Sequence, residues 1–172
     1  MNCEALTQAA LGAGAAKAVV IEQKQIVLSE TFFDNCKSNQ CGFYNRCWMC
    51  PPDTGDIHDL MAALRGYPHA LLYQTIGALE DSFDIEGMQA AARVHAGVGQ
   101  KLRAALDPLL VGNRLHLTCG GCRLCETCAK RDDLPCRHPR EAMPSLESYG
   151  VDVYNTTKDT PLRYINGQNT VT

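Results

Sequence analysis

Apolar residues recur along the chain at spacings that predict several helices and strands. The longest helix is predicted at residues 85–106, with Ser82 or Asp84 as its N-cap and Pro108 as its stop. Its apolar residues repeat at the 3.6-residue helical period, which places them on one buried face: Ile85, Met88, Ala92, His95, Val98, Leu102 and Leu106. Shorter helices are predicted at residues 3–11, 57–65 and 144–150.

Short apolar runs between these helices predict strands. The predicted strands are residues 17–22, 26–29, 69–76, 109–111, 115–117, 151–154, 162–165 and 169–172. The first two are separated by a tight turn, and Asn166-Gly167 predicts a hairpin between the last two, because Asn-Gly favours the turns that join paired strands. The second arm of that hairpin ends with the sequence, so we expect either a natural terminus there or a further strand.

The order of these elements predicts an α/β or α+β fold. We expect a single compact domain over residues 1–172, with a small mixed sheet, flanking helices and two cysteine-rich metal-binding loops. The metal-binding segments are residues 36–52 and 119–139.

Composition adds little except for cysteine. The net charge of −3 provides no electrostatic reason to expect a nucleic acid or an anionic membrane as a partner, and no run approaches 18 apolar residues.

There are ten cysteines, and nine of them lie in two short windows, residues 36–50 and 119–136. The first residues after Met1 have neither a basic stretch nor an apolar core, so the sequence predicts no signal peptide and a cytoplasmic location. In that reducing compartment, clustered cysteines favour metal sites over disulfides.

The second window contains three successive C-x₂-C steps, from Cys119 to Cys128, followed by Cys136. A two-residue spacer lets neighbouring thiolates converge on one centre, as in the bacterial ferredoxin run that holds three corners of a [4Fe–4S] cluster. Cys122, Cys125 and Cys128 fit those corners, and Cys136 fits the fourth. Gly120 and Gly121 would let backbone amides approach the sulfurs.

Zinc is the alternative for this window. Cys119, Cys122, Cys125 and Cys128 supply the four thiolates of a structural zinc site. Such sites usually separate their two C-x₂-C pairs by a dozen residues or more, which favours a cluster here. In the cluster interpretation, Cys119 is not one of the four ligands. It is then a core cysteine, an alternate ligand or a ligand shared with the first window.

The first window contains Cys36, Cys41, Cys47 and Cys50, followed by Pro51-Pro52. Four thiolates are enough for one more site, and a Cys-Pro step also closes ferredoxin motifs. The spacers of four and five residues are not diagnostic, so zinc, iron–sulfur and one site shared between both windows all stay open.

These motifs resemble the DUF2284 family of predicted metal-binding proteins. The resemblance lies in Cys41-Gly-Phe-Tyr-Asn-Arg-Cys-Trp-Met-Cys50-Pro-Pro and Gly121-Cys-Arg-Leu-Cys-Glu-Thr-Cys128. It continues through Pro135-Cys-Arg-His-Pro139 and the block from Met143 to Val153. It implies that Cys122, Cys125, Cys128 and Cys136 are one ligand set and that Cys36, Cys41 and Cys50 belong to another. The resemblance does not assign Cys47 and Cys119 to either set, and both remain candidate metal ligands.

The sequence therefore favours an iron–sulfur protein with one or two [4Fe–4S] clusters that passes electrons to a redox partner protein. Arg123, Lys130, Arg131, Arg137 and Arg140 form a basic rim that suits an acidic partner, although an ordinary solvated loop explains them as well. Two other classes remain: an enzyme whose cluster keeps an open iron site on Cys36, Cys41 and Cys50, and a zinc-stabilised interaction module.

Overall fold

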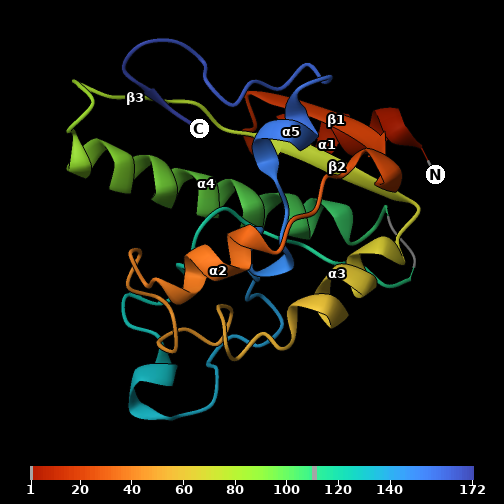
Figure 1. The fold of residues 1–172 in the computed structure, drawn as a ribbon. Coiled ribbons are helices and arrows are strands. Elements are labelled where there is room, and N and C mark those ends of the chain that lie inside the picture. Colours follow the sequence, from red (N-terminus) through yellow and green to blue (C-terminus); the bar gives the residue numbers. More distant parts are fainter. Residues whose placement is uncertain (1, 110–111) are drawn as a thin grey trace. The chain divides into compact units, whose positions relative to one another are not determined.

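The contacts of the chain fall into two compact units. The computed structural model describes residues 2–109 and 112–172, so the predicted strand at 109–111 lies largely outside the described residues. Unit 1 consists of Met1–Glu22, His69–Asn113 and Tyr154–Thr172, and unit 2 of Gln23–Pro68 and Arg114–Val153. The mixed α/β fold class is confirmed, with strands that form two-stranded antiparallel sheets in the described part of the chain (Figure 1).

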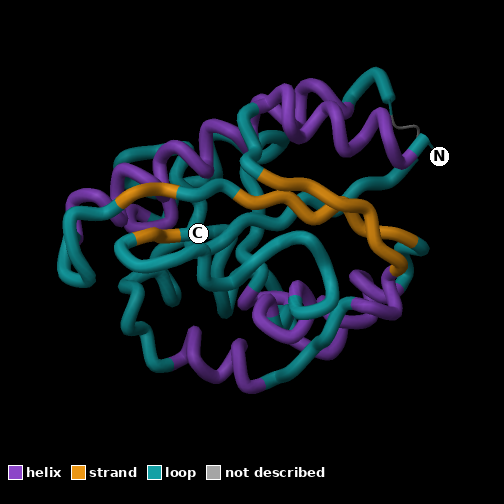
Figure 2. Tube along the Cα trace, turned by 90° about the horizontal axis from the view of Figure 1, so that it is seen from above, coloured by secondary structure: helices purple, strands orange, loops and turns teal. Residues whose placement is uncertain are grey.

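Unit 1 packs two helices and an antiparallel strand pair around one apolar core. Its elements are α1 (Cys3–Ala13), β1 (Lys17–Glu22), β2 (His69–Gln74), β3 (Gly77–Ala78), α4 (Ile85–Leu106) and β4 (Thr170–Val171). Figure 2 shows β1 and β2 side by side, and their register places Val19 opposite Leu72. The buried core residues come from α1, α4 and the turn between α1 and β1: Leu6, Ala10, Ala13, Ala15, Val98, Leu102 and Leu106.

The long helix begins and ends where the sequence predicts. Asp84 is its N-cap, and its carboxylate accepts the Gly87 N–H at 2.8 Å. The predicted apolar face is buried only in the second half of the helix, because that half packs on α1. Ile85, in the first turn, is 58% exposed, which contradicts its predicted place on a buried face.

Two strand pairings differ from the prediction. Residues 26–29 do not pair with β1. The segment Gln23–Gln25 forms a short 3₁₀ helix, η1, and Leu28 makes an isolated bridge to Val151, while β1 pairs with the distant β2. The predicted C-terminal hairpin is also wrong, because β4 pairs with β3. In both cases the observed partner strand lies far away in sequence.

Unit 2 contains the cysteine windows and little regular structure. Its elements are η1, α2 (Thr31–Lys37), α3 (Ile57–Arg65), η2 (Ala129–Asp132) and η3 (Glu147–Tyr149). Where a strand was predicted at 151–154, the helix α5 (Val153–Thr157) begins at the last residue of unit 2 and continues into unit 1. Its buried core is Leu60, Leu64, Tyr149 and Val151. Asp56 caps α3, as predicted, by accepting the His58 N–H at 2.9 Å. Gly150 ends η3 at φ 68°, and a Cβ there would lie 2.9 Å from the Ser29 carbonyl oxygen.

No helix within residues 2–109 and 112–172 has both the length and the apolar character needed to cross a membrane.

Candidate metal centre

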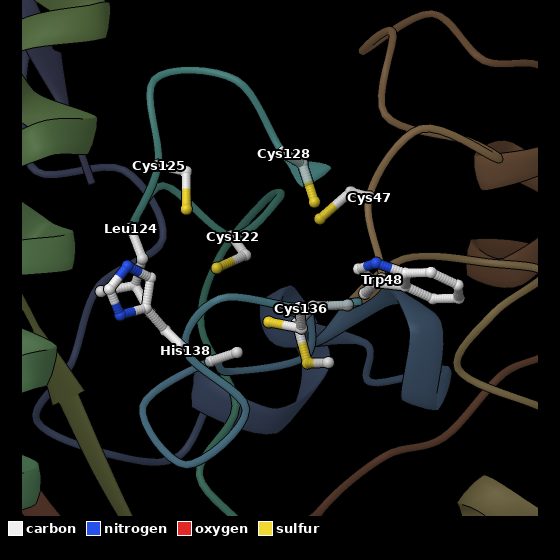
Figure 3. A pocket seen from close by; sticks show the side chains of 10 residues that line it. Cys47, Trp48, Cys122, Leu124, Cys125, Cys128, Cys136 and His138 are labelled. Atoms are coloured by element: carbon white, nitrogen blue, oxygen red, sulfur yellow. The ribbon is translucent and has the colours of Figure 1, made fainter. Parts of the chain in front are cut away.

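Five cysteines from the two windows line one cavity in unit 2. Cys47 comes from the first window, and the other four come from the second (Figure 3). The cavity is lined by Cys47, Trp48, Met49, Cys122, Leu124, Cys125, Cys128, Cys136, His138 and Ala142. In Figure 3 the sulfurs of Cys122, Cys125 and Cys136 border the open space, and those of Cys47 and Cys128 point toward one another. The structure therefore brings together the four cysteines predicted as one ligand set, and it adds Cys47.

Local turns hold the second window in this arrangement. Cys128 precedes η2, and the Arg131 N–H donates to the Cys128 carbonyl at 3.1 Å. Farther along, the Arg137 guanidinium donates to the Thr127 carbonyl at 2.9 Å. That bond ties the residue after Cys136 to the residue before Cys128, so the most distant cysteine of the set is brought back to the C-x₂-C steps.

Cys47 has the environment of a thiolate. It is 1% exposed, and hydrogen bonds lower its pKa to about 6. The largest cause is the hydrogen bond from the Cys50 thiol, and further ones come from the backbone of Met49 and Cys122 and from the Cys128 thiol, against the opposing effect of burial. The pKa of Cys50 is raised, because its thiol donates the hydrogen bond to Cys47. The hydrogen-bond donors around the Cys47 sulfur therefore favour the thiolate form.

Polar contacts of Trp48 and Lys130 fasten the first window to the second. The Trp48 indole N–H donates to the Leu134 carbonyl at 2.9 Å. The Lys130 ammonium lies 4.3 Å from the centre of the Trp48 ring and 2.8 Å from the Asp53 carboxylate. Both members of this ion pair are largely buried, with 15% and 13% of the side chains exposed. Lys130 is thus a largely buried contact between the two windows, and it does not belong to the basic rim predicted from the sequence.

Phe43 and Gly121 form a second junction between the windows. A Cβ on Gly121 would lie 2.7 Å from two atoms of the Phe43 ring, closer than packed atoms approach. The Arg123 guanidinium lies 5.7 Å from the centre of the same ring. The sequence predicted that Gly121 would let its amide approach the sulfurs. In the structure, its missing side chain also makes room for an aromatic ring.

The other first-window cysteines lie outside the cavity lining, although the Cys50 thiol hydrogen-bonds to Cys47. Cys36 ends up half-buried near the end of α2, Cys41 is exposed, and Cys50 is buried. The pKa of Cys36 is raised to about 11, chiefly by burial and then by the charges of Glu147 and Cys41. The charges of Cys41 and Cys36 also contribute to the raised pKa of Cys50, so these three thiols are close enough to influence one another.

Cys119 and Cys3 lie outside the cavity lining. Cys119 is exposed overall, yet the protein around its thiol raises its pKa by desolvation, and the charge of Glu147 adds to this. Cys3 is an exposed residue at the start of α1 in unit 1. His138 also lines the cavity.

Glu147 is a site residue that the sequence analysis missed. Its Oε2 is buried and has no hydrogen-bond partner among the described residues. Its charge acts on both Cys36 and Cys119. A lone acidic residue in a turn has no diagnostic spacing. The only hint was its place within the block from Met143 to Val153 that carries the family resemblance.

The donors around the cavity suit a metal group bound by sulfur, because thiolates are the preferred ligands of iron–sulfur clusters and of structural zinc. Within the part of the chain that the structure describes, no three His, Cys, Asp or Glu side chains form a ready-made site for a single metal ion.

Comparison with known proteins returned one family. The family model described as "Predicted metal-binding protein (DUF2284)" matches residues 19–172, nearly the whole chain. No curated protein and no solved structure matched.

Proposed function

The chain belongs to the DUF2284 family of predicted metal-binding proteins, and from this premise we propose that it is an iron–sulfur protein that transfers electrons. In this proposal Cys122, Cys125, Cys128 and Cys136 hold a [4Fe–4S] cluster. Bound there, the cluster would supply reversible one-electron chemistry.

The observation that carries the proposal is the shared cavity. Cys122, Cys125 and Cys128 follow one another at two-residue spacings, and Cys136 lines the same cavity. This is the ligand pattern of a ferredoxin-type cluster. Structural zinc also takes four thiolates, but its usual wide gap between C-x₂-C pairs is missing here.

Neighbouring residues would tune this centre without binding it. The Cys47 sulfur lies beside Cys128, where a thiol or thiolate changes the charge next to a ligand. Trp48 lines part of the cavity wall and would limit the access of water to a cluster bound there. The exposed Arg131 and Arg140 follow in the same segment and would attract an acidic redox partner, most simply in the cytoplasm.

The first experiment measures iron, zinc and acid-labile sulfide per chain after anaerobic purification. We expect about four or eight iron with matching sulfide. In Cys125→Ala, about four iron and their sulfide should be lost. Cys3→Ala is the matched control, because Cys3 is exposed in unit 1, and it should keep the wild-type content.

The result that contradicts the proposal is one or two zinc per chain without sulfide, which would favour a zinc-stabilised interaction module. If iron and sulfide are present, a potentiometric titration decides the electron-transfer role. Reversible one-electron reduction supports it, and a centre that cannot be reduced reversibly contradicts it.

A further inference from the structure

The Glu147 carboxylate occupies an unusual environment for a charged group. Its Oε2 is buried, and within residues 2–109 and 112–172 nothing donates a hydrogen bond to it. Carboxylates in such places are normally paired with a cation or a donor, since burial removes the stabilisation by water. The nearby ionisable groups on which its charge acts are thiols, Cys36 and Cys119, and a thiolate would repel it.

The backbone holds Glu147 in place between the two cysteine windows. Thr118, the residue before Cys119, makes a parallel bridge to Ser145, and the Leu146 N–H donates to the Thr118 carbonyl at 2.8 Å. On the other side, the Ser145 N–H donates to the carbonyl of Met49, the residue before Cys50, at 3.4 Å. The backbone position of Glu147 is therefore fixed by contacts with residues next to both windows.

Ser145 and Ser148 make this segment rigid. The Ser148 side chain is completely buried, its hydroxyl donates to the Ser145 carbonyl at 2.7 Å, and its N–H donates to the Ser145 hydroxyl at 3.1 Å. Element η3 also contacts α2, the helix that carries Cys36. The segment that carries Glu147 thus lies against the first window, and the polar groups of Ser145 and Ser148 are hydrogen-bonded to each other.

We propose that Cys36, Cys41, Cys50 and the Glu147 carboxylate bind a second iron–sulfur cluster, in which Glu147 is the non-cysteine ligand. Three thiolates and one carboxylate make up the four ligands that a [4Fe–4S] cluster requires, and the cluster distributes these ligands over four iron ions. Iron also supplies the positive charge that the buried oxygen lacks. This site uses a different set of ligands from the cluster of the proposed function, and it adjoins that cavity, because the Cys50 thiol hydrogen-bonds to Cys47.

Cys47 and Cys119 are the competing fourth ligands. Cys47 lines the other cavity, and its sulfur points toward Cys128 in Figure 3. The Cys47 sulfur already accepts hydrogen bonds from the Cys50 and Cys128 thiols, and Cys119 lies in the second window. Glu147 is the buried group that has no hydrogen-bond partner among the described residues, and its segment contacts α2, the helix that carries Cys36.

The test compares the anaerobically purified full-length protein with Glu147→Gln, Glu147→Cys and Cys119→Ala. The readouts are iron, sulfide and the electron paramagnetic resonance (EPR) spectrum of the reduced protein.

The wild type should hold about eight iron and eight sulfide. Glu147→Gln should lose iron and the signal of the second cluster while the first cluster's signal stays. Glu147→Cys should keep the iron and change that signal, because a thiolate replaces an oxygen ligand. Cys119→Ala and the control Glu80→Gln, an exposed residue of unit 1, should both match the wild type.

The proposal is overturned if the wild type holds only about four iron, if Glu147→Gln matches the wild type, or if Cys119→Ala loses the second cluster instead. Should Glu147→Gln fail to fold, Glu147→Cys decides: a changed signal supports the proposal, and an unchanged one overturns it. Cys125→Ala removes the other cluster, so failure of this inference is distinct from failure of the proposed function.

Discussion

At Gly121, a single missing side chain allows the two cysteine windows to pack together. An alanine there would place its Cβ 2.7 Å from the Phe43 ring, and the ring would have to move. We expect Gly121→Ala to lower the free energy of unfolding of the metal-free protein by about 1–3 kcal/mol, the usual cost of overpacking. Urea unfolding followed by circular dichroism measures it.

Gly97→Ala is the matched control for that substitution. Gly97 lies within α4, and a Cβ there meets no atom within 4 Å, so alanine should stabilise the protein by about 0.5–1 kcal/mol through its higher helix propensity. Adding Phe43→Leu to Gly121→Ala should recover part of the loss. Equal stability of Gly121→Ala and the wild type would show that the ring relaxes freely.

At the scale of elements, His95 fastens α4 to the strand β2 and the residue that follows it. Its ring stacks on Tyr73 with centroids 5.4 Å apart, and its Nδ1 lies 3.0 Å from the Thr75 hydroxyl. The sequence analysis placed His95 on the buried face of the long helix, and the structure gives it these two partners. Burial lowers the pKa of His95 below its ordinary value of 6.5.

This lowered pKa makes stability depend on pH. The unfolded chain takes up the His95 proton at a higher pH than the folded chain, so the stability from the neutral ring is complete above pH 6.5 and is lost as the pH falls below it. Thermal unfolding between pH 8 and pH 5 measures the effect. His95→Gln should flatten this pH dependence, and His69→Gln, an exposed histidine at the start of β2, should keep it. Identical profiles for His95→Gln and the wild type would contradict the assignment.

The elements also show how far the sequence alone can predict. The bounds of β1 and α4 were predicted correctly, because an apolar run or stripe and a cap such as Asp84 are local signals. The pairing of β1 with β2 was not predicted, because register across nearly fifty residues depends on which apolar faces meet in the core.

The same limit applies to the prediction of the metal site. Spacing identified the cysteines, but their division between the cavity lining and a second group, and the role of Glu147, depend on contacts distant in sequence.

For the molecule as a whole, metal should stabilise one unit and leave the other unchanged. All the cysteines except Cys3 belong to unit 2, and a ligand that binds only the folded state of that unit raises its stability by mass action. We expect two transitions in scanning calorimetry, of which anaerobic metal removal lowers one. Leu102→Ala, in the core of unit 1, should lower the other, at a cost of about 2–5 kcal/mol.

Amide hydrogen exchange tests the same prediction segment by segment along the chain. Metal removal should speed exchange in residues 23–68 and 114–153 and spare α1, β1 and α4. Calorimetry could instead show a single transition whose temperature is lowered both by metal removal and by Leu102→Ala. That result would favour one cooperative domain over residues 1–172, as the sequence predicts.

The order of the segments along the chain has a consequence for biosynthesis. The chain enters unit 2 at residue 23, leaves it at residue 68, returns at 114 and leaves again at 153. On a ribosome, which adds about 5–20 residues per second, every proposed metal ligand is therefore synthesised before residues 154–172 complete unit 1. Metal binding in unit 2 can accordingly precede the pairing of β4 with β3 in unit 1.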